Sequence, residues 1–245
     1  MTLDDTMKII DLGKIRYEDS LDFQISLVER RKEDLETDTL ILAEHPPTIT
    51  LGSDEKWNVV NASEEEIFRK GIDLHKNGNG KKWISRGGGA AYLGPGQLIG
   101  YVVMDVSQYG IFNFLRMLEE VMMKTAKGFG IEINRVDRLN PSTDKLYRAT
   151  WYEKDGRYFV LCTKGIGIKS WKDKLITHHG FALNVNEGYD HYDLIDPCGF
   201  PKSEIEPISM QKILKREINM KEVKEKIVRN FGYVFKREME YGVCV

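Results

Sequence analysis

The stretch HHGFALNVNEGYDHYDLIDPCGF, residues 178–200, organises the interpretation of the whole chain. The apolar residues 175–177 predict a strand end that runs into two histidines and a glycine, and residues 181–185 predict a further apolar strand. Beyond them, Cys198 stands in a turn between a proline and a glycine. Because a thiol near imidazoles and exposed backbone N–H groups suits a nucleophile, Cys198 is the first candidate for chemistry.

The segments around this stretch alternate between strand-like and helix-like patterns. Short apolar runs predict strands, and apolar residues spaced three and four apart predict helices. The predicted strands are residues 7–12, 39–43, 48–51, 98–106, 131–136, 147–153 and 157–163, and the predicted helices are residues 21–35, 63–70, 115–129 and two segments near the end of the chain. Asp19 or Ser20 is available to cap the first helix, and a capping box begins at Ser63.

This order of elements favours an α+β fold. The strands come in groups interrupted by helices rather than in strict alternation, which predicts a mixed β-sheet or an antiparallel one, flanked by helices. The pattern shows no internal repeat or long linker. We therefore expect one catalytic domain over residues 1–245, in which residues 203–245 form a C-terminal helical closing segment.

The composition limits the partners and the compartment. Of the 245 residues 41% are hydrophobic and 30% are charged, as in an ordinary globular protein. The net charge of −2 predicts no general affinity for nucleic acid or an anionic membrane. Cys162, Cys198 and Cys244 are too few and too scattered for a disulfide framework or a zinc module, so a cytoplasmic location is favoured. No signal peptide or membrane-spanning run is expected.

A glycine-rich tract is the second candidate for function. Three consecutive glycines after Arg86 let the backbone pass close to a ligand, and Arg86 supplies a cation at the rim. A bulged hairpin with a structural arginine explains the same pattern equally well. Because the tract is neither a P-loop nor a dinucleotide fingerprint followed by a helix, nucleotide binding is not supported.

Several other groups bear on Cys198. His178 and His179 point to opposite faces if their strand is regular, and with one cysteine they supply too few ligands for zinc. A basic run follows the predicted hairpin, and most of its lysines are expected to face water. A lysine near Cys198 would lower the thiol pKa. The lysines of this run are Lys164, Lys169, Lys172 and Lys174.

Four sequence blocks together resemble the lipoyl(octanoyl) transferase family, and the resemblance runs nearly end to end. Residues 44–52 resemble the family's E-H-P-P-x-x-T-L-G, and residues 86–101 resemble R-G-G-x-x-x-Y-H-G-P-G-Q-L-x-x-Y. Residues 179–185 resemble H-G-x-A-L-N-x, and residues 197–199 supply the P-C-G that follows it. Four blocks in the right order identify the chain as a member of this family.

The resemblance implies a biotin/lipoate protein ligase-like fold and a specific reaction. Cys198 would take an octanoyl group from octanoyl-acyl carrier protein as a thioester and pass it to a lysine of a lipoyl domain, in a 2-oxoacid dehydrogenase or the glycine cleavage H protein. This reaction needs no ATP, no other cofactor and no metal, because the donor thioester is already activated. The implied catalytic pair is Cys198 and Lys164. The implied substrate-binding residues are Arg86, Gly87, Gly88, Gly89, Ala90, Ala91, Tyr92, Leu93, Gly165, Ile166, Gly167, His179, Gly180, Phe181 and Ala182.

The match to the family departs at two places. Counted back from His179 without a gap, the lysine that lowers the pKa of the cysteine is Lys164. Aligning the Ile-Gly pair instead puts Cys162 at that position and leaves Lys169 as the alternative cation. Leu93 stands where the family usually has histidine, which removes a polar group from the predicted pocket.

Three other functions remain open. The glycine tract, Tyr92 and the doubled histidine also resemble ATP-dependent lipoate–protein ligases, which share the fold with biotin–protein ligases and need no cysteine nucleophile. An amidotransferase could move octanoyl or lipoyl groups between proteins through Cys198. A binding module could hold an acylated carrier domain without turnover, for which Leu93 is the sole support. The Pro-Cys-Gly turn argues for the transferase over the ligase and the binding module.

Overall fold

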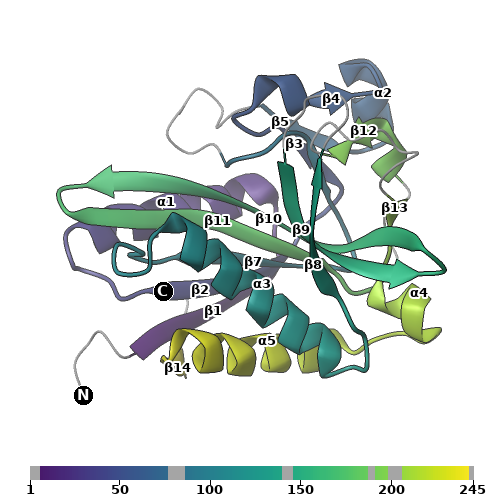
Figure 1. Ribbon diagram of the computed structural model, residues 1–245. Coiled ribbons are helices and arrows are strands. Elements are labelled where there is room, and N and C mark those ends of the chain that lie inside the picture. The colour runs from purple at the N-terminus through teal and green to yellow at the C-terminus, as the bar shows by residue number, and fades with distance from the viewer. Residues whose placement is uncertain (1–5, 77–85, 140–145, 187–190, 198–205, 243–245) are drawn as a thin grey trace.

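A large mixed sheet forms the centre of the molecule. The computed structural model describes residues 6–76, 86–139, 146–186, 191–197 and 206–242, and within these ranges the sheet has nine strands (Figure 1). In spatial order they are β14 (Glu238–Tyr241), β1 (Thr6–Lys14), β2 (Thr39–Glu44), β7 (Gln97–Val103), β11 (Lys174–Asn184), β10 (Arg157–Trp171), β9 (Leu146–Lys154) and β8 (Asn134–Leu139), with β13 (Glu206–Pro207) beside β10. β14, β1 and β2 run parallel, and the order from β2 to β8 is antiparallel throughout. The predicted α+β fold with a mixed sheet is confirmed.

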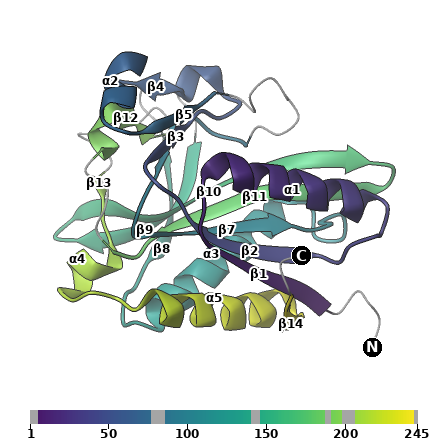
Figure 2. The ribbon, with the colours of Figure 1, turned by 180° about the vertical axis from the view of Figure 1, so that it is seen from behind.

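Helices cover both faces of this sheet. Helix α1 (Tyr17–Lys32) lies on one face, and α3 (Ile111–Lys127) and α5 (Met220–Phe235) lie together on the other, as the two opposite views show (Figures 1 and 2). Side chains alternate between two cores along each strand. In β2, for example, Leu40 and Leu42 join the core under α3 and α5, whereas Ile41 joins the core under α1. The sheet therefore has an α1 face and an α3 face.

A smaller layer lies beside one end of the main sheet (Figure 1). It contains a three-stranded sheet and a two-stranded sheet, and the described part of the chain adds α2 and two 3₁₀ turns. Its elements are β3 (Thr48–Thr50), β4 (Val59–Val60), β5 (Asp73–His75), β6 (Ala91–Leu93), β12 (Ile195–Asp196), α2 (Glu64–Arg69) and the turns Glu55–Trp57 and Tyr192–Leu194. Helix α4 (Met210–Leu214) leads from the main sheet into α5.

The structure corrects several predicted boundaries. Helix α1 begins at Tyr17, so Asp19 and Ser20 lie inside its first turn and do not cap it. The predicted cap of α2 is confirmed, because the Ser63 hydroxyl accepts a hydrogen bond from the Glu66 N–H at 3.2 Å. Strand β11 continues through the predicted histidine–glycine corner. The edge strand β14 was not predicted, since its four residues carry only partial burial and depend on pairing with β1.

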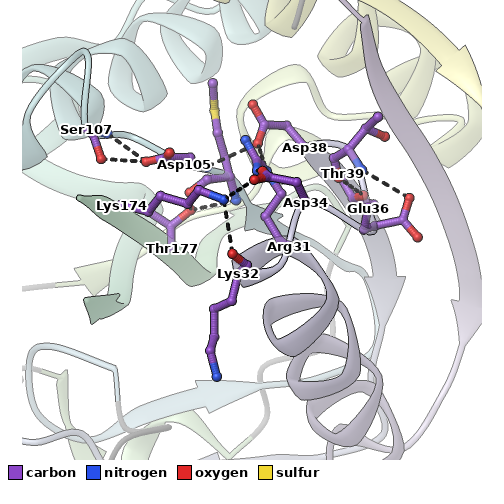
Figure 3. Close-up of polar contacts among 12 residues, drawn as sticks. Arg31, Lys32, Asp34, Glu36, Asp38, Thr39, Asp105, Ser107, Lys174 and Thr177 are labelled. Carbon is purple, nitrogen blue, oxygen red and sulfur yellow. Dashed lines mark hydrogen bonds and ion pairs between the residues drawn. The ribbon is translucent and has the colours of Figure 1, made fainter. Parts of the chain in front are cut away.

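A buried carboxylate joins α1 to the residues that flank β2 and β7 (Figure 3). Asp38, directly before β2, is 5% exposed and accepts hydrogen bonds from Arg31 Nε of α1 at 2.8 Å and from the Asp105 N–H at 3.1 Å. Arg237, which precedes β14, lies 3.5 Å from its second oxygen. Nearby, the Lys174 amine at the start of β11 contacts Asp34 at 2.6 Å. One carboxylate thus compensates two buried guanidinium groups.

Asp38→Asn should destabilise the fold by about 3–5 kcal/mol, because the buried Arg237 would lose its counter-charge and Arg31 would keep only the exposed Asp34. Asp34→Asn is a suitable control, since Asp34 is 69% exposed and its ion pairs should contribute less than about 1 kcal/mol. Urea unfolding of both variants measures the difference. Equal stability of the two variants would contradict the assigned role of Asp38.

Candidate active site

The floor of the candidate site is a strip of paired residues on the α1 face of the sheet. Strands β7 and β11 pair so that Gln97 lies opposite Asn184, Ile99 opposite Ala182 and Tyr101 opposite Gly180. Strand β10 extends the last two rows, with Thr163 opposite Ala182 and Gly165 opposite Gly180. Paired residues in an antiparallel sheet share a face. All eight residues line one pocket.

The glycine tract and the smaller layer cover this floor. The Gly87 N–H donates to the Ile166 carbonyl of β10 at 2.8 Å, which attaches the tract to the main sheet. Arg86 donates from Nη2 to the Thr50 carbonyl and hydroxyl of β3 at 2.8 and 2.7 Å. Arg86 therefore has a structural role, because it holds β3 in place, and it also lines the pocket.

The pocket has a volume of about 750 Å³, counting the part open to solvent. It brings together most residues predicted to bind substrate: Arg86, Gly87, Ala90, Ala91, Tyr92, Leu93, Gly165, His179, Gly180, Phe181 and Ala182. Gly88 and Gly89 instead pack against the loop at residues 52–57, and Ile166 and Gly167 lie outside the lining.

Other lining residues were not predicted. They are Tyr17, Thr50, Gln97, Ile99, Tyr101, Thr163, Asn184, Tyr192 and Pro197. The period of two along a strand could have identified Gln97, Ile99 and Tyr101 together. Tyr17 has no such signal, because it reaches the pocket only through the packing of α1 against the sheet.

The first row of the floor is held by side-chain amides. Gln97 Nε2 donates to Asn184 Oδ1 at 2.9 Å, and Gln97 Oε1 accepts from the Gly94 N–H at 2.9 Å. Asn184 Nδ2 in turn donates to the Val160 carbonyl at 3.2 Å. Both amides are almost fully buried, so their mutual hydrogen bonds are needed to compensate lost water. This network explains why the motifs G-P-G-Q and A-L-N supply amide side chains at these positions.

A local change in backbone conformation brings His179 into the pocket. In a regular strand His178 and His179 would face opposite sides, but His179 has a φ of 57° and the two rings lie 5.0 Å apart. Because the strand is not regular at His179, the two rings do not lie on opposite faces, and of the two residues His179 alone lines the pocket. A left-handed residue costs roughly 1–2 kcal/mol, and the His179 N–H is compensated by the buried Gln24 Oε1 of α1 at 2.8 Å.

His45 and Tyr101 form a buried hydrogen-bonded pair at the third row. His45 Nε2 lies 2.6 Å from the Tyr101 hydroxyl, and His45 Nδ1 lies 2.7 Å from the Ile15 carbonyl. Burial lowers the pKa of His45 from 6.5 to about 4, so its ring is neutral at pH 7. Since a carbonyl can only accept, Nδ1–H donates to Ile15 and Nε2 accepts from Tyr101. Burial also raises the pKa of Tyr101 well above 10.

The neutral His45 should make stability depend on pH. Between pH 6.5 and about 4 the unfolded chain binds a proton that the native His45 does not bind, so stability falls as pH falls through this range. The loss at pH 4 relative to pH 7 should be about 3 kcal/mol. His45→Gln, whose amide does not titrate, should remove this part of the pH dependence in urea unfolding. An unchanged slope in the variant would disprove the assignment.

The Lys164 side chain is directed into the α3 face. Lys164 lies opposite Phe181 in the β10–β11 register, and the Phe181 ring belongs to the α3 core. The Lys164 amine forms an ion pair with Glu119 of α3, which is 1% exposed. Arg116 and Arg135 contact the other oxygen of Glu119 at 2.8 and 3.0 Å. These contacts lower the pKa of Glu119, although its burial has the opposite effect.

The alternative positions considered for the lysine differ in environment. Lys169 pairs with Ile176, two rows further along the hairpin than Gly165, and is not part of the pocket lining. Cys162 is buried and lies 2.7 Å from the Thr150 hydroxyl, and burial raises its pKa to about 11. Cys162 is thus a core residue, as its mid-strand position predicts.

Cys198 and Cys244 lie outside the described residues. Pro197, which directly precedes Cys198, is described and lines the pocket. Within the described ranges there is no cluster of three or more metal-ligating side chains. None of the helices in these ranges has the length and apolar content needed to cross a membrane.

The sequence matches the family described as lipoyl protein ligase A/B catalytic domain over residues 16–232. Among curated proteins, the octanoyltransferase of Koribacter versatilis is 32% identical over 237 residues, which covers 95% of this chain and 86% of that protein. The octanoyltransferase of Caldicellulosiruptor saccharolyticus is 33% identical over 238 residues, which covers 96% of this chain and 91% of that protein.

Solved structures show the same fold at low sequence identity. A bipartite lipoate protein ligase from Thermoplasma acidophilum has a TM-score of 0.68 and 14% identity, covering 98% of this chain and 88% of that one. Lipoate-protein ligase A bound with ATP has a TM-score of 0.65 and 15% identity, covering 99% and 90%. The lipoate ligase-like fold predicted from the sequence is confirmed.

Proposed function

This chain belongs to the lipoyl protein ligase A/B catalytic domain family, and we propose that it is an octanoyltransferase that acts in protein lipoylation. The relatives named above support octanoyl transfer. We propose octanoyl-acyl carrier protein as the donor. The proposed acceptor is a lipoyl domain, of a 2-oxoacid dehydrogenase or of the glycine cleavage H protein.

The observation that carries this proposal is an apolar pocket whose lining includes Pro197. The middle of the floor is made of Ile99 and Ala182, and Leu93 adds apolar surface from the smaller layer. An apolar strip bordered by hydrogen-bonded amides suits an acyl chain whose carbonyl end is polar. Pro197 lines the same pocket and is followed in sequence by Cys198.

The proposed reaction has two acyl transfers. The Cys198 thiolate attacks the carbonyl carbon of the donor thioester, and the carrier's phosphopantetheine sulfur leaves as a thiolate. An uncharged lysine amine of the lipoyl domain then attacks the acyl-enzyme, an amide bond forms as the thioester C–S bond breaks, and the amine gives up one proton to water. The Cys198 thiolate leaves and takes part in the next cycle. Because one thioester replaces another before the amide forms, neither step consumes ATP or requires a metal.

We retain Lys164 as the proposed cation that favours the Cys198 thiolate. Lys164 contributes to the pocket lining, and Glu119 restrains its amine. The Lys164 amine would act on the Cys198 thiol electrostatically, from the α3 side of the sheet. We further propose that residues 1–245 act as one catalytic domain, which the pairing of β14 with β1 supports. We also propose that this domain acts in the cytoplasm.

Replacing Lys164 by methionine should shift the pH dependence of cysteine alkylation to higher pH, because a cation that favours the thiolate is lost. The measurement is the rate of iodoacetamide modification of Cys198 between pH 5 and 10, followed by peptide mass spectrometry. Lys169→Met is the matched control and should leave the profile unchanged. A shift in the Lys169 variant alone would assign the role to Lys169.

The acyl-enzyme itself is tested by intact-protein mass after mixing with octanoyl-acyl carrier protein in the absence of ATP. The wild type should gain one octanoyl group, and added lipoyl domain should remove it. Cys198→Ser should keep the fold, as circular dichroism can check, and should abolish transfer. Undiminished transfer by this variant would refute the cysteine mechanism.

The same experiment separates the transferase from the ATP-dependent ligase. Lipoyl-domain modification that requires free octanoic acid and ATP, with no mass gain on the enzyme from the acylated carrier, would establish the ligase. Transfer between two lipoyl-type domains, but not from the acyl carrier protein, would establish an amidotransferase.

A further inference from the structure

We propose that Tyr101, held in place by His45, closes the inner end of the acyl pocket and sets the longest acyl chain that the enzyme transfers. This inference rests on the proposed function, because it assigns an acyl chain to the pocket. It adds a specificity determinant that acts through the shape of the pocket rather than through the reacting atoms.

The register of the floor gives the pocket a direction and a length. Gln97, Ile99 and Tyr101 are successive residues of one face of β7, so neighbouring rows are two positions apart along the strand. The third row runs across the strands from Gly165 of β10 over Gly180 of β11 to Tyr101 of β7, and two strand spacings give it a length of about 9.5 Å. An extended octanoyl chain with seven C–C bonds spans roughly 9 Å. The third row therefore has about the length of an extended octanoyl chain, with Tyr101 at its β7 end.

The third row is enclosed at its β7 end, where Tyr101 lies, and more open at its β10 end, where Gly165 lies. Tyr101 and Tyr17 are 3% and 6% exposed, whereas Gly87, Thr163 and Gly165 in the same lining are only partly buried. We therefore place the entrance for the acyl chain on the side of the glycine tract and β10. An acyl chain that enters there extends toward the two tyrosines.

The rings at the enclosed end surround Tyr101. The His179 ring lies 6.2 Å from that of Tyr101 and 6.5 Å from that of Tyr17, measured between centroids. The His45 ring lies 5.8 Å from both tyrosine rings. The His45 and His179 rings therefore restrain the Tyr101 side chain on the sides that they contact.

Hydrogen bonds oppose displacement of Tyr101. Its hydroxyl donates to His45 Nε2 at 2.6 Å, and His45 is fixed by its second nitrogen to the Ile15 carbonyl at 2.7 Å. The backbone of β7 is paired on both sides, with β2 and β11. A longer chain would have to break the Tyr101–His45 hydrogen bond and leave two buried polar groups without a partner. Tyr101 thus acts as a rigid stop.

The test is the chain-length profile of acyl transfer by wild type, Tyr101→Ala and Tyr101→Leu. Each protein is given hexanoyl-, octanoyl-, decanoyl- and dodecanoyl-acyl carrier protein, and modification of a lipoyl domain is followed by mass spectrometry. In Tyr101→Ala the rate for dodecanoyl relative to octanoyl should rise at least about tenfold over wild type, since the removed ring frees space at the end of the pocket. Tyr101→Leu retains more of the buried volume and should shift the ratio in the same direction by less.

Val103→Ala is the matched control. Val103 is the next residue of β7 on the same face, is fully buried and does not line the pocket. This variant should lose stability but keep the wild-type chain-length profile. If either Tyr101 variant folds and transfers octanoyl groups with the wild-type profile, the proposal is overturned, and the same holds if Val103→Ala shifts the profile as much.

Failure of the proposed function would give a different result. If the wild type transfers no acyl group from any carrier without ATP, octanoyl transfer from the carrier protein is refuted. The same series is then supplied as free fatty acids with ATP, and the ratio of dodecanoyl to octanoyl modification again decides whether Tyr101 limits the chain.

Discussion

The close packing of β7 against β11 is the constraint on which the pocket depends. A Cβ atom on Gly180 would lie 2.1 Å from the Gly100 carbonyl oxygen, and one on Gly100 would lie 2.1 Å from the Phe181 ring. A side chain at Gly180 would force the two strands apart, and one at Gly100 would displace the Phe181 ring. This contact holds the register that puts Gln97 and Tyr101 on the pocket face, and a slip by one residue would turn both toward α3.

The two faces of the sheet have different tasks. The α3 face carries the larger apolar core and the ion pair between Glu119 and Lys164, and these side chains stabilise the strands from behind. The α1 face carries the pocket, where small residues such as Ala182 leave room for a ligand. Because β10, β11 and β7 each contribute to both faces, the core that stabilises them also fixes the positions of the lining residues.

The polar groups of the pocket are ordered before any substrate arrives. Hydrogen bonds within the folded chain join Gln97 to Asn184, Arg86 to Thr50 and Tyr101 to His45. A ligand that enters such a site loses little of its binding free energy to ordering the protein. The same rigidity makes the length of the pocket a fixed quantity, which is what selection of an acyl chain by length requires.

The sequence by itself determined the family, the α+β class and most of the lining, because motifs such as R-G-G and A-L-N keep their residues adjacent in the chain. It could not place Tyr17, which enters the pocket only when α1 packs on the sheet. Nor could it show that Lys164 points toward Glu119, since strand register decides which face a side chain occupies. The inward turn of His179 likewise required the tertiary structure, because a left-handed backbone in a strand persists only where a partner such as Gln24 compensates it.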